Sequence, residues 1–502
     1  MPVALDPMPR PLDHLADCGR DEAPALVLRG RTLTWRDLRA RIAQLAGWLS
    51  AQGFAPGDRV ASWAAKGELT CLLPLAAARA GLVHVPVNPL LKRGQTAHIV
   101  GDSGAKLLVG TPARLATLEP GEVTCDVIGE DAVWQMVDSV NSSLPASSAD
   151  PNDLAALLYT SGSTGQPKGV MLSHANMWLG AVSVAHYLGL AEDDVTLAVL
   201  PLSFDYGQNQ LFSTWYAGGC AVPLEYLTPR DVIKACGRYG VTTLAAVPPL
   251  WVQLVEQDWP SDAVAAMRRL TNSGGALTVD LVSNLRAQFP QARLFPMYGL
   301  TEAFRSTYLS PELVDSHPTS MGKAIPFAEI LVIGDDGDVT APGEEGELVH
   351  CGPLVAQGYW NDPERTAERF KPAPKASEYG GMAVWSGDRV RRDADGLLYF
   401  VGRRDAMIKS AGNRISPQEI EDAALASGLV AEAVALGVPD TRLGQAVVLI
   451  VRGSNDDAGL KAALKRDLPN FMQPQAIHWV EAMPINPNGK IDRTALQQKL
   501  AA

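Results

Sequence analysis

The sequence lacks the long hydrophobic runs that a membrane protein needs. Its longest apolar stretches, such as residues 71–78, are far shorter than the roughly 20 residues that cross a bilayer. The first residues, MPVALDPMPRPLDHL, contain no basic segment followed by an apolar one, so they do not indicate a signal peptide. We therefore expect a cytoplasmic protein without a stable membrane anchor.

Positively charged residues are fewer than negatively charged ones. The 43 lysines and arginines are outnumbered by 55 aspartates and glutamates, which gives a formal net charge of −12. Such a chain repels a phosphate backbone unless it carries a local basic stripe, and the sequence shows none. We therefore expect no nucleic-acid partner, and an anionic substrate must be held by a local site.

Cysteine is scarce and scattered. No two cysteines have the C-x-x-C spacing that is typical of a zinc site or a redox motif, so the sequence predicts free thiols. The six positions are Cys18, Cys71, Cys125, Cys220, Cys236 and Cys351.

The order of the expected elements indicates an α/β fold. Thr34 and Asp37 have the spacing of a helix N-cap, and apolar residues recur on one face from there to Leu49. Strand-like and helix-like segments then alternate, which is typical of a mainly parallel sheet covered on both faces. We predict a large N-terminal body (1–402) of α/β subdomains with parallel sheets, a β-rich subdomain within it (about 330–402), and a small α+β C-terminal domain (403–502).

A candidate phosphate-binding loop is the most informative stretch. Residues 154–159 form an apolar strand that runs into a loop rich in glycine and hydroxyl groups. Glycines let backbone N–H groups turn toward an anion, hydroxyls add donors, and a lysine adds positive charge. Neither G-x-x-x-x-G-K-[ST] nor a G-x-G-x-x-G after a strand is present, which excludes a P-loop and a dinucleotide fold. The loop residues are Thr160, Ser161, Gly162, Ser163, Thr164, Gly165 and Lys168.

Five motifs, in order along the chain, resemble those of the adenylate-forming (AMP-binding) superfamily. They are YTSGSTGQPKGV (159–170), MYGLTE (297–302), GELVHCGPLVAQGYWNDPERTAERF (346–370), SGD (386–388) with GRRDAMIKSAGNRISPQEIE (402–421), and NPNGKIDR (486–493). The superfamily includes acyl-CoA synthetases, amino-acid-activating domains and luciferases, and the chain is similar to exosortase-associated acyl-CoA ligases. The resemblance implies an enzyme that activates a carboxylic acid as an acyl-adenylate with ATP and Mg²⁺.

The resemblance also implies which residues bind the nucleotide. It assigns the loop 160–168 to the β- and γ-phosphates, Thr301 to the α-phosphate and Glu302 to Mg²⁺. Asp388 would accept hydrogen bonds from the ribose, with help from Arg403. The other nucleotide-binding residues that it implies are Gly275, Ala276, Tyr298, Gly299, Lys409 and Arg414.

Two poses of a mobile C-terminal domain are implied as well, with a hinge at Asp405 that absorbs the change in backbone angles. In the first pose Lys490 would bridge the acid's carboxylate and the α-phosphate. Lys490, Thr301 and Glu302 are therefore the predicted catalytic residues. In the second pose the strand that contains Lys409 would face the active site and shape the tunnel through which the thiol enters.

The predicted acid pocket leaves the substrate open. The resemblance places Phe204, Asp205, Tyr206, Pro248 and Arg305 around the acid, with Phe204 as a gate toward the thiol. A buried carboxylate at Asp205 needs a partner. That partner is either the ammonium group of an amino acid or Arg305, and the second alternative allows a fatty or aryl acid.

The thiol acceptor also has two candidates. The form Gly-Leu-Thr-Glu and the lack of an attached carrier domain favour an acyl-CoA synthetase that uses CoA. Many such ligases carry a lysine or serine near the position of Ala411, and this departure weakens the assignment. The alternative is a ligase that loads an acyl or amino acid onto the phosphopantetheine of an acyl or peptidyl carrier protein. The oligomeric state is left open.

Overall fold

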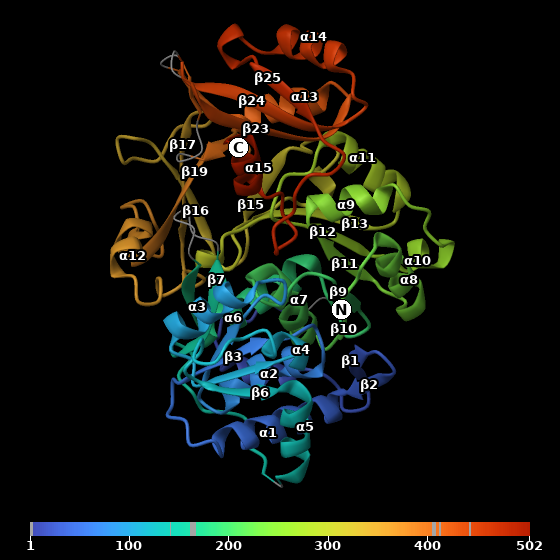
Figure 1. Ribbon diagram of the computed structural model, residues 1–502, viewed down its shortest axis with the longest axis vertical. Helices are drawn as coiled ribbons and strands as arrows, with labels where there is room; N and C mark the ends of the chain where they lie inside the picture. The colour runs from blue at the N-terminus through green and yellow to red at the C-terminus, as the bar shows by residue number, and fades with distance from the viewer. Residues whose placement is uncertain are drawn as a thin grey trace.

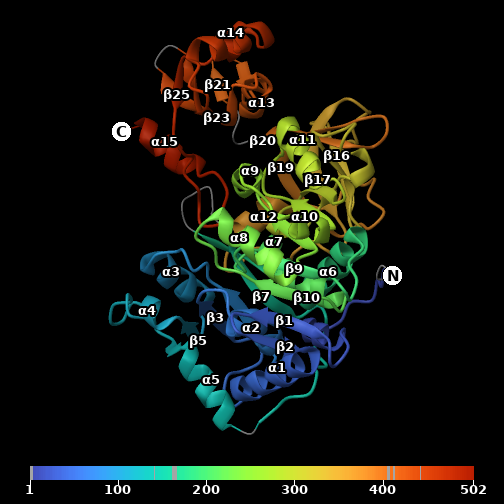
Figure 2. The same cartoon turned by 90° about the vertical axis from the view of Figure 1, so that its right-hand side faces the viewer.

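The computed structural model describes residues 4–501, apart from 141, 161–166, 404–407, 411–412 and 441–442. The N-terminal elements lie at one end of the long axis and the C-terminal elements at the other (Figures 1 and 2). Two large sheets build the body. α2 (Glu68–Arg79) packs on the first sheet, α7 (Asp205–Tyr216) packs on the second, and α6 (His174–Leu188) packs against α7.

The first sheet has the order β6-β5-β3-β4-β7-β8. Its neighbouring strands are parallel except for the last pair, β7 and β8, which form a hairpin. The strands are β3 (Arg59–Trp63), β4 (Val83–Pro86), β5 (Leu107–Gly110), β6 (Asp126–Gly129), β7 (Leu154–Thr160) and β8 (Lys168–Ser173). The helices of this region are η1 (Leu12–Asp17), α1 (Trp35–Ser50), α3 (Arg93–Ser103), α4 (Pro112–Leu115) and α5 (Glu130–Ser139).

The second sheet begins with parallel strands in the order β10-β9-β11-β12-β13, with β1 parallel to β10 and β2 antiparallel on β1. These strands are β1 (Pro24–Leu28), β2 (Arg31–Thr34), β9 (Val195–Ala198), β10 (Cys220–Pro223), β11 (Thr243–Ala246), β12 (Arg269–Asn272) and β13 (Arg293–Tyr298). The helices around them are α8 (Pro229–Tyr239), α9 (Pro248–Val255), α10 (Ser261–Ala266) and α11 (Val279–Gln288).

The same sheet continues beyond β13 as antiparallel strands in the order β14-β15-β20-β19-β17-β16, with β18 beside β19. They are β14 (Thr307–Tyr308), β15 (Ser320–Ala324), β16 (Glu329–Ile333), β17 (Glu345–Cys351), β18 (Phe370–Pro372), β19 (Met382–Arg392) and β20 (Leu398–Arg403). Short helices lie between them: η2 (Thr301–Ala303), η3 (Pro311–Leu313) and α12 (Pro363–Arg369).

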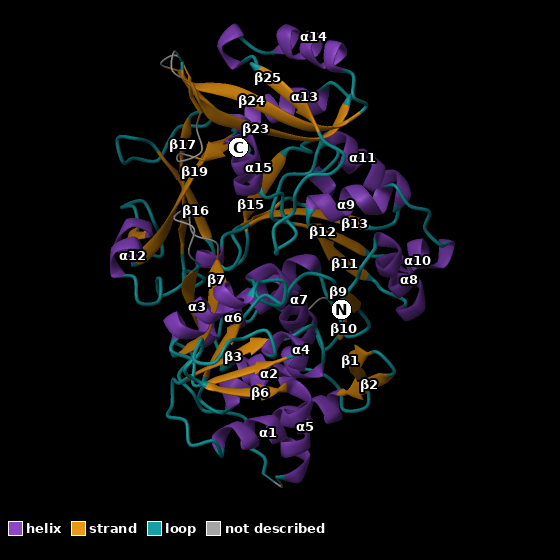
Figure 3. Cartoon of the chain, in the orientation of Figure 1, coloured by secondary structure: helices purple, strands orange, loops and turns teal. Residues whose placement is uncertain are grey.

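The C-terminal elements form a separate sheet of the order β22-β21-β24-β23, with β25 parallel to β24 (Figure 3). Its strands are β21 (Ile408–Ser410), β22 (Asn413–Ile415), β23 (Val430–Asp440), β24 (Gly444–Gly453) and β25 (Ala476–Trp479). Its helices are α13 (Pro417–Ala426), α14 (Asp457–Asp467), η4 (Asn470–Met472) and α15 (Arg493–Ala501). The α/β fold class, with a smaller α+β unit at the C-terminus, is confirmed.

Local sequence accounts for the start of α1. The side chain of Thr34 accepts a hydrogen bond from the amide of Asp37, and the side chain of Asp37 accepts one from the amide of Thr34. The helix α2 continues through a proline. It begins at Glu68 and includes Pro74, whose apolar surroundings bury the whole turn.

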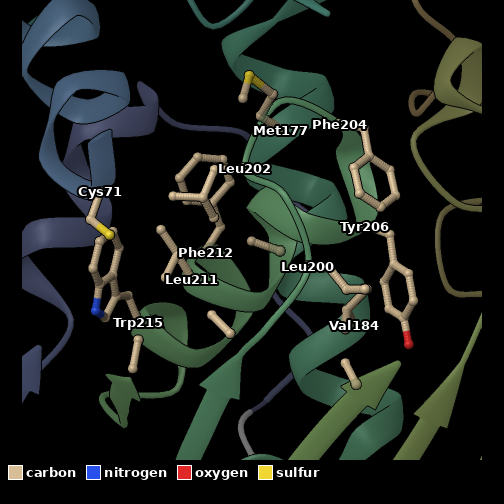
Figure 4. Close-up of a cluster of buried hydrophobic side chains, with 14 of the residues drawn as sticks. Cys71, Met177, Val184, Leu200, Leu202, Phe204, Tyr206, Leu211, Phe212 and Trp215 are labelled. Carbon is tan, nitrogen blue, oxygen red and sulfur yellow. The ribbon is translucent and has the colours of Figure 1, made fainter. Parts of the chain in front are cut away.

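A cluster of buried side chains from α2, α6 and α7 fills the space between the sheets (Figure 4). The start of α7 approaches the preceding loop so closely that a Cβ on Gly207 would lie 1.8 Å from the carbonyl oxygen of Pro201. Only glycine fits there. Among the helices of the described ranges, none combines the length and the apolar character that a membrane span requires.

Candidate active site

The predicted phosphate loop connects two strands of the first sheet. Thr160 at the end of β7 lies opposite Lys168 at the start of β8 in the antiparallel register. The hydroxyl oxygen of Thr160 is buried and has no hydrogen-bond partner among the described residues, which suits a contact to a ligand. The predictions for Ser161, Gly162, Ser163, Thr164 and Gly165 lie outside the residues that the structure describes.

Lys168 belongs to a compact cluster of charged and polar groups. Its ammonium group donates to the hydroxyl of Tyr359 at 2.7 Å and lies 3.9 Å from the centre of the tyrosine ring. The same hydroxyl donates to Oε1 of Glu302 at 2.6 Å, and the ammonium lies 3.6 Å from that oxygen. Tyr359 therefore joins the lysine predicted to bind phosphate to the carboxylate predicted to bind magnesium.

Backbone pairing explains how Tyr359 reaches this position. The amide of Met171 in β8 donates to the carbonyl of Gly358 at 2.9 Å, and the amide of Ala356 donates to the carbonyl of Glu302 at 2.9 Å. The segment 356–359 is thereby fixed between the phosphate hairpin and η2. The sequence prediction missed Tyr359 as a site residue, although the tyrosine lies inside one of the five motifs.

The electrostatic environment keeps the carboxylate of Glu302 ionised. Burial alone would raise the pKa of Glu302, but the hydrogen bond from Tyr359 and the charges of Lys168 and Arg369 contribute to a net lowering of that pKa. Burial lowers the pKa of Lys168, and the charge of Glu302 opposes this effect. The cluster therefore offers an ionised, hard oxygen ligand beside a cationic group.

A second cluster lies at the end of β13. The hydroxyl of Tyr298 donates to Oδ2 of Asp388 at 2.5 Å, and Nε of Arg403 lies 3.1 Å from Oδ1 of the same carboxylate. Asp388 and Arg403 are directly paired across β19 and β20. Burial, reinforced by the carboxylate of Asp388, raises the pKa of Tyr298, so its phenol stays protonated. The structure thus brings together three residues that the sequence assigned to the nucleoside.

The segment after β12 brings a third group of predicted residues to the site. Gly274 adopts a φ of +83°, and a Cβ there would lie 2.6 Å from Cε of Lys490. Glycine is favoured because this positive φ is strained for any residue with a side chain. A Cβ on Gly275 would lie 3.0 Å from Cγ of Pro248, so these two predicted residues are neighbours. Gly275 and Ala276 are exposed.

Lys490 reaches the body on the loop that precedes α15. Oδ1 of Asn486 accepts the amides of Asn488 and Lys490 at 3.0 Å each, which folds the loop into a tight turn. Nδ2 of Asn88 donates to the carbonyl of Pro487 and to Oδ1 of Asn488, both at 2.9 Å. Asn88 therefore attaches the lysine's loop to the N-terminal body. Nothing in its local sequence distinguishes it, and the sequence prediction missed it.

Three of the predicted acid-pocket residues lie at the start of α7. Phe204 and Tyr206 lie side by side, with ring centroids 6.5 Å apart in an edge-to-face arrangement (Figure 4). Asp205 is buried and accepts a hydrogen bond from the hydroxyl of Thr301 at 3.1 Å. Among the described residues no ion pair joins Asp205 to Arg305. The ammonium group of an amino acid therefore stays a candidate partner of Asp205.

Some predicted residues are only partly described. The hinge residue Asp405 lies outside the described ranges. Lys409 and Arg414 are paired backbone to backbone across β21 and β22, but their side chains lie outside the description. Gly299 lies just after β13, where a Cβ would approach Cα of Arg305 to 3.1 Å. The roles of these four residues stay predictions.

Comparison with known families gives two matches. The family model described as AMP-binding enzyme matches residues 14–360. The model described as AMP-binding enzyme C-terminal domain matches residues 419–490. Between the two models lie residues 361–418, which include α12, β18 to β22 and the predicted hinge.

Curated relatives include ligases with different acceptors. The chain is 32% identical to L-proline--[L-prolyl-carrier protein] ligase of Pseudomonas fluorescens over 95% of this chain and 96% of the relative. It is also 32% identical to a feruloyl-CoA synthase of an Amycolatopsis species, over 92% and 93%. It is 31% identical to tyrocidine synthase 2 of Brevibacillus parabrevis over 95% of this chain, but spans only 13% of that relative.

A solved structure shows the same architecture. MatB of Rhodopseudomonas palustris, crystallised with bound ATP, superimposes with a TM-score of 0.88 at 26% identity. The match covers 98% of this chain and 99% of MatB, so it includes the smaller C-terminal unit as well as the body.

Proposed function

Because the chain belongs to the AMP-binding enzyme family, we propose that it is an AMP-forming acid–thiol ligase of the acyl-CoA synthetase type. It forms an acyl-adenylate from a carboxylic acid and ATP with release of pyrophosphate. It then transfers the acyl group to CoA and releases AMP. We place the boundary between its two domains at residues 402–403 and the hinge at Asp405.

One observation carries this proposal: Lys490, from the C-terminal domain, lies against Gly274 of the body. The attack of a carboxylate on the α-phosphate brings two anions together, so catalysis depends on positioning and on positive charge. Lys490 supplies that charge at the segment 273–276, while Lys168 and Thr160 bind the phosphates that leave. Tyr298, Asp388 and Arg403 hold the nucleoside.

The charge state of Lys490 depends on its neighbours. Burial lowers its pKa below the ordinary lysine value, and the nearby charge of Asp205 offsets part of this decrease. Asp205 is itself held by Thr301 at 3.1 Å. In the proposed reaction the ammonium group neutralises the charge that develops where the carboxylate and the α-phosphate meet.

The residues present fit a magnesium ion. The ionised carboxylate of Glu302 is a hard oxygen ligand, and the described residues contain no cluster of three or more metal-ligating side chains. Mg²⁺ is usually bound by one or two carboxylates together with substrate phosphates and water. When bound, it would neutralise phosphate charge. Glu302 would hold it, with Tyr359 and Lys168 fixing the carboxylate.

A carrier protein is the second candidate acceptor. It is favoured by Asp205, which is buried in the acid pocket as an ammonium-binding aspartate would be, and by the relative that acts on a prolyl carrier. Release of AMP, measured with CoA and then with a phosphopantetheinylated carrier protein, decides between the two. Acceleration by CoA alone supports the synthetase, acceleration by the carrier alone supports the alternative, and acceleration by neither contradicts a thiol ligase.

Tyr359→Phe tests the link between Lys168 and Glu302. The variant keeps the ring beneath the ammonium but removes the hydroxyl that contacts both charges. Because a hydrogen bond to a charged group contributes about 1.5–3 kcal/mol, we expect KM for ATP to rise roughly tenfold or more. Tyr159→Phe is the matched control, because its hydroxyl donates to Asp102 at 2.5 Å and contacts neither charge. Equal effects of the two variants would contradict the assignment.

Asn88→Asp tests how the loop of Lys490 is held. An aspartate keeps the oxygen that accepts the amide of Leu90 at 2.9 Å, but it replaces the amide group that donates to Pro487 and Asn488. Losing two hydrogen bonds costs about 1–2 kcal/mol, so we expect adenylate formation to slow about tenfold. Thiol transfer from a supplied adenylate should be unchanged.

Glu256→Gln is the control for this experiment. Glu256 lies 3.7 Å from Arg452 of the C-terminal domain, and its side chain is 54% exposed. Exposed ion pairs contribute little, so neither half-reaction should change. If Asn88→Asp slowed both half-reactions equally, Asn88 would have a general structural role instead.

A further inference from the structure

Lys66 connects the two sheets of the body. It lies between β3 of the first sheet and α2, and its ammonium group donates to the carbonyls of Val199 at 2.6 Å and Leu200 at 3.3 Å. Both residues directly follow β9 of the second sheet. The amide of Lys66 donates to Oε1 of Glu225, which follows β10, at 2.9 Å. The lysine therefore binds the chain where it leaves two neighbouring strands of the second sheet.

The stretch after β9 depends on this donor. The carbonyl of Ala198, the last residue of β9, accepts the amide of Leu224 at 3.1 Å. Val199 and Leu200 then leave the sheet, although each is only 2% exposed. A buried carbonyl that lacks a donor is costly, and a hydrogen bond from an ammonium group is about twice as strong as a neutral one. The ammonium of Lys66 therefore fixes the backbone at this point.

The loop beyond β9 packs directly against the first turn of α7. A Cβ on Gly207 would lie 1.8 Å from the carbonyl oxygen of Pro201 and 3.3 Å from the carbonyl carbon of Leu200. Because no space separates the loop from the helix, a shift of this backbone displaces the start of α7. Figure 4 shows Leu200 on this loop and, further along the same chain, Phe204 and Tyr206.

The start of α7 connects this loop to the reacting site. Asp205 accepts the hydroxyl of Thr301 at 3.1 Å, and the hydroxyl of Tyr206 forms a hydrogen bond with that of Thr271 at 2.7 Å. A displaced first turn would alter both contacts. The position of the loop therefore determines how the predicted acid pocket faces Thr301, the residue predicted to bind the α-phosphate.

We propose that Lys66 is a positioning residue for the carboxylic acid: its ammonium group fixes the loop 199–203 and thereby places Phe204, Asp205 and Tyr206 around the substrate. It acts through this loop and not through contact with a substrate. The inference rests on the proposed function, since it names a residue that shapes the acid pocket of that enzyme.

The strength of this contact depends on pH. Burial lowers the pKa of Lys66 to about 8, and the carboxylate of Glu225 opposes this effect. The thiol of Cys71 in α2 also faces the ammonium, but burial raises the pKa of that thiol to about 12, so the thiol stays neutral. The ammonium is therefore charged below about pH 8, and the contact weakens as it loses its proton above that pH.

Lys66→Met tests this role, because methionine keeps an apolar side chain and removes the ammonium. ATP–pyrophosphate exchange is measured with fatty, aryl and amino acids, such as octanoate, benzoate and L-proline, and the best substrate is used. At pH 7 we expect KM for that acid to rise about tenfold, and KM for ATP to stay within about twofold. Lys234→Met is the control, because Lys234 is an exposed lysine on α8, and it should change neither KM.

The pH dependence separates positioning from packing. The ratio of the acid's KM in Lys66→Met to that in the wild type should fall from about tenfold at pH 7 to about threefold at pH 9.5, because the wild type loses the charge. Lys490 is present in both proteins, so the ratio isolates Lys66. Glu225→Gln removes the charge that opposes the decrease in the pKa of Lys66. In this variant, KM for the acid should begin to rise at a lower pH than in the wild type.

The outcomes are distinct. An unchanged KM for the acid, an equal rise in both KM values, or a ratio that is independent of pH would overturn the inference. The comparison of Glu225→Gln with the wild type needs no variant of Lys66, so an unshifted profile would overturn the inference even if Lys66→Met did not fold. If the wild type supported exchange with no acid of the three classes, the proposed function itself would fail.

Discussion

Replacing Lys490 by alanine is expected to slow adenylate formation about a hundredfold or more and to leave thiol transfer from a supplied acyl-adenylate intact. The lysine lies against Gly274, on the loop that Asn88 fixes to the body. It is the only group from the C-terminal domain that we place at the reacting phosphate. Loss of a cation that acts mainly in the transition state costs on the order of 3 kcal/mol.

The two half-reactions are measured separately for this variant. ATP–pyrophosphate exchange reports the first, and release of AMP from the supplied adenylate with CoA reports the second. Lys499→Ala is the control, because Lys499 is an exposed lysine on α15 of the same domain. If Lys490→Ala impaired both half-reactions or neither, the assignment of Lys490 to the first step would be wrong.

Glu302→Gln is expected to lower the exchange activity about a hundredfold at a fixed concentration of Mg²⁺. Glutamine preserves the shape of the side chain but removes its negative charge. The oxygen can still accept the hydroxyl of Tyr359, so the local packing is kept. Lys168 loses its carboxylate partner at 3.6 Å, and the site loses its ionised ligand for the metal.

A magnesium titration distinguishes this role from a loss of stability. The variant should need a higher Mg²⁺ concentration for half-maximal exchange, while its thermal unfolding midpoint stays close to that of the wild type. Tyr359→Phe is the matched comparison, because it removes a neighbour of the carboxylate and keeps the carboxylate itself. An unchanged magnesium requirement in Glu302→Gln would contradict the assignment of Glu302 to the metal.

Local sequence patterns predicted the elements that depend only on residues close together in the chain. The cap of α1 needs only Thr34 and Asp37, and the phosphate hairpin follows from an apolar strand before a glycine-rich loop. The α/β fold class followed from the alternation of such elements. The helix α2 is a case where local sequence is insufficient, because Pro74 disfavours a helix interior and the burial of its apolar residues stabilises it.

Groups that meet through long-range contacts could not be predicted in the same way. Tyr359 enters the site because its segment pairs with β8, and Asn88 because it meets a loop near the other end of the chain. An asparagine in a short loop carries no local signal of such a contact. The partner of Asp205 likewise depends on packing: the sequence offered an amine or Arg305, and the structure adds Thr301.

ATP–pyrophosphate exchange without CoA tests the central claim most directly. The enzyme is incubated with ATP, Mg²⁺, labelled pyrophosphate and one carboxylic acid at a time. The account predicts that label enters ATP only when a suitable acid is present, and that adding the thiol then releases AMP. Formation of ADP and phosphate, or incorporation of label that does not depend on any acid, would contradict it.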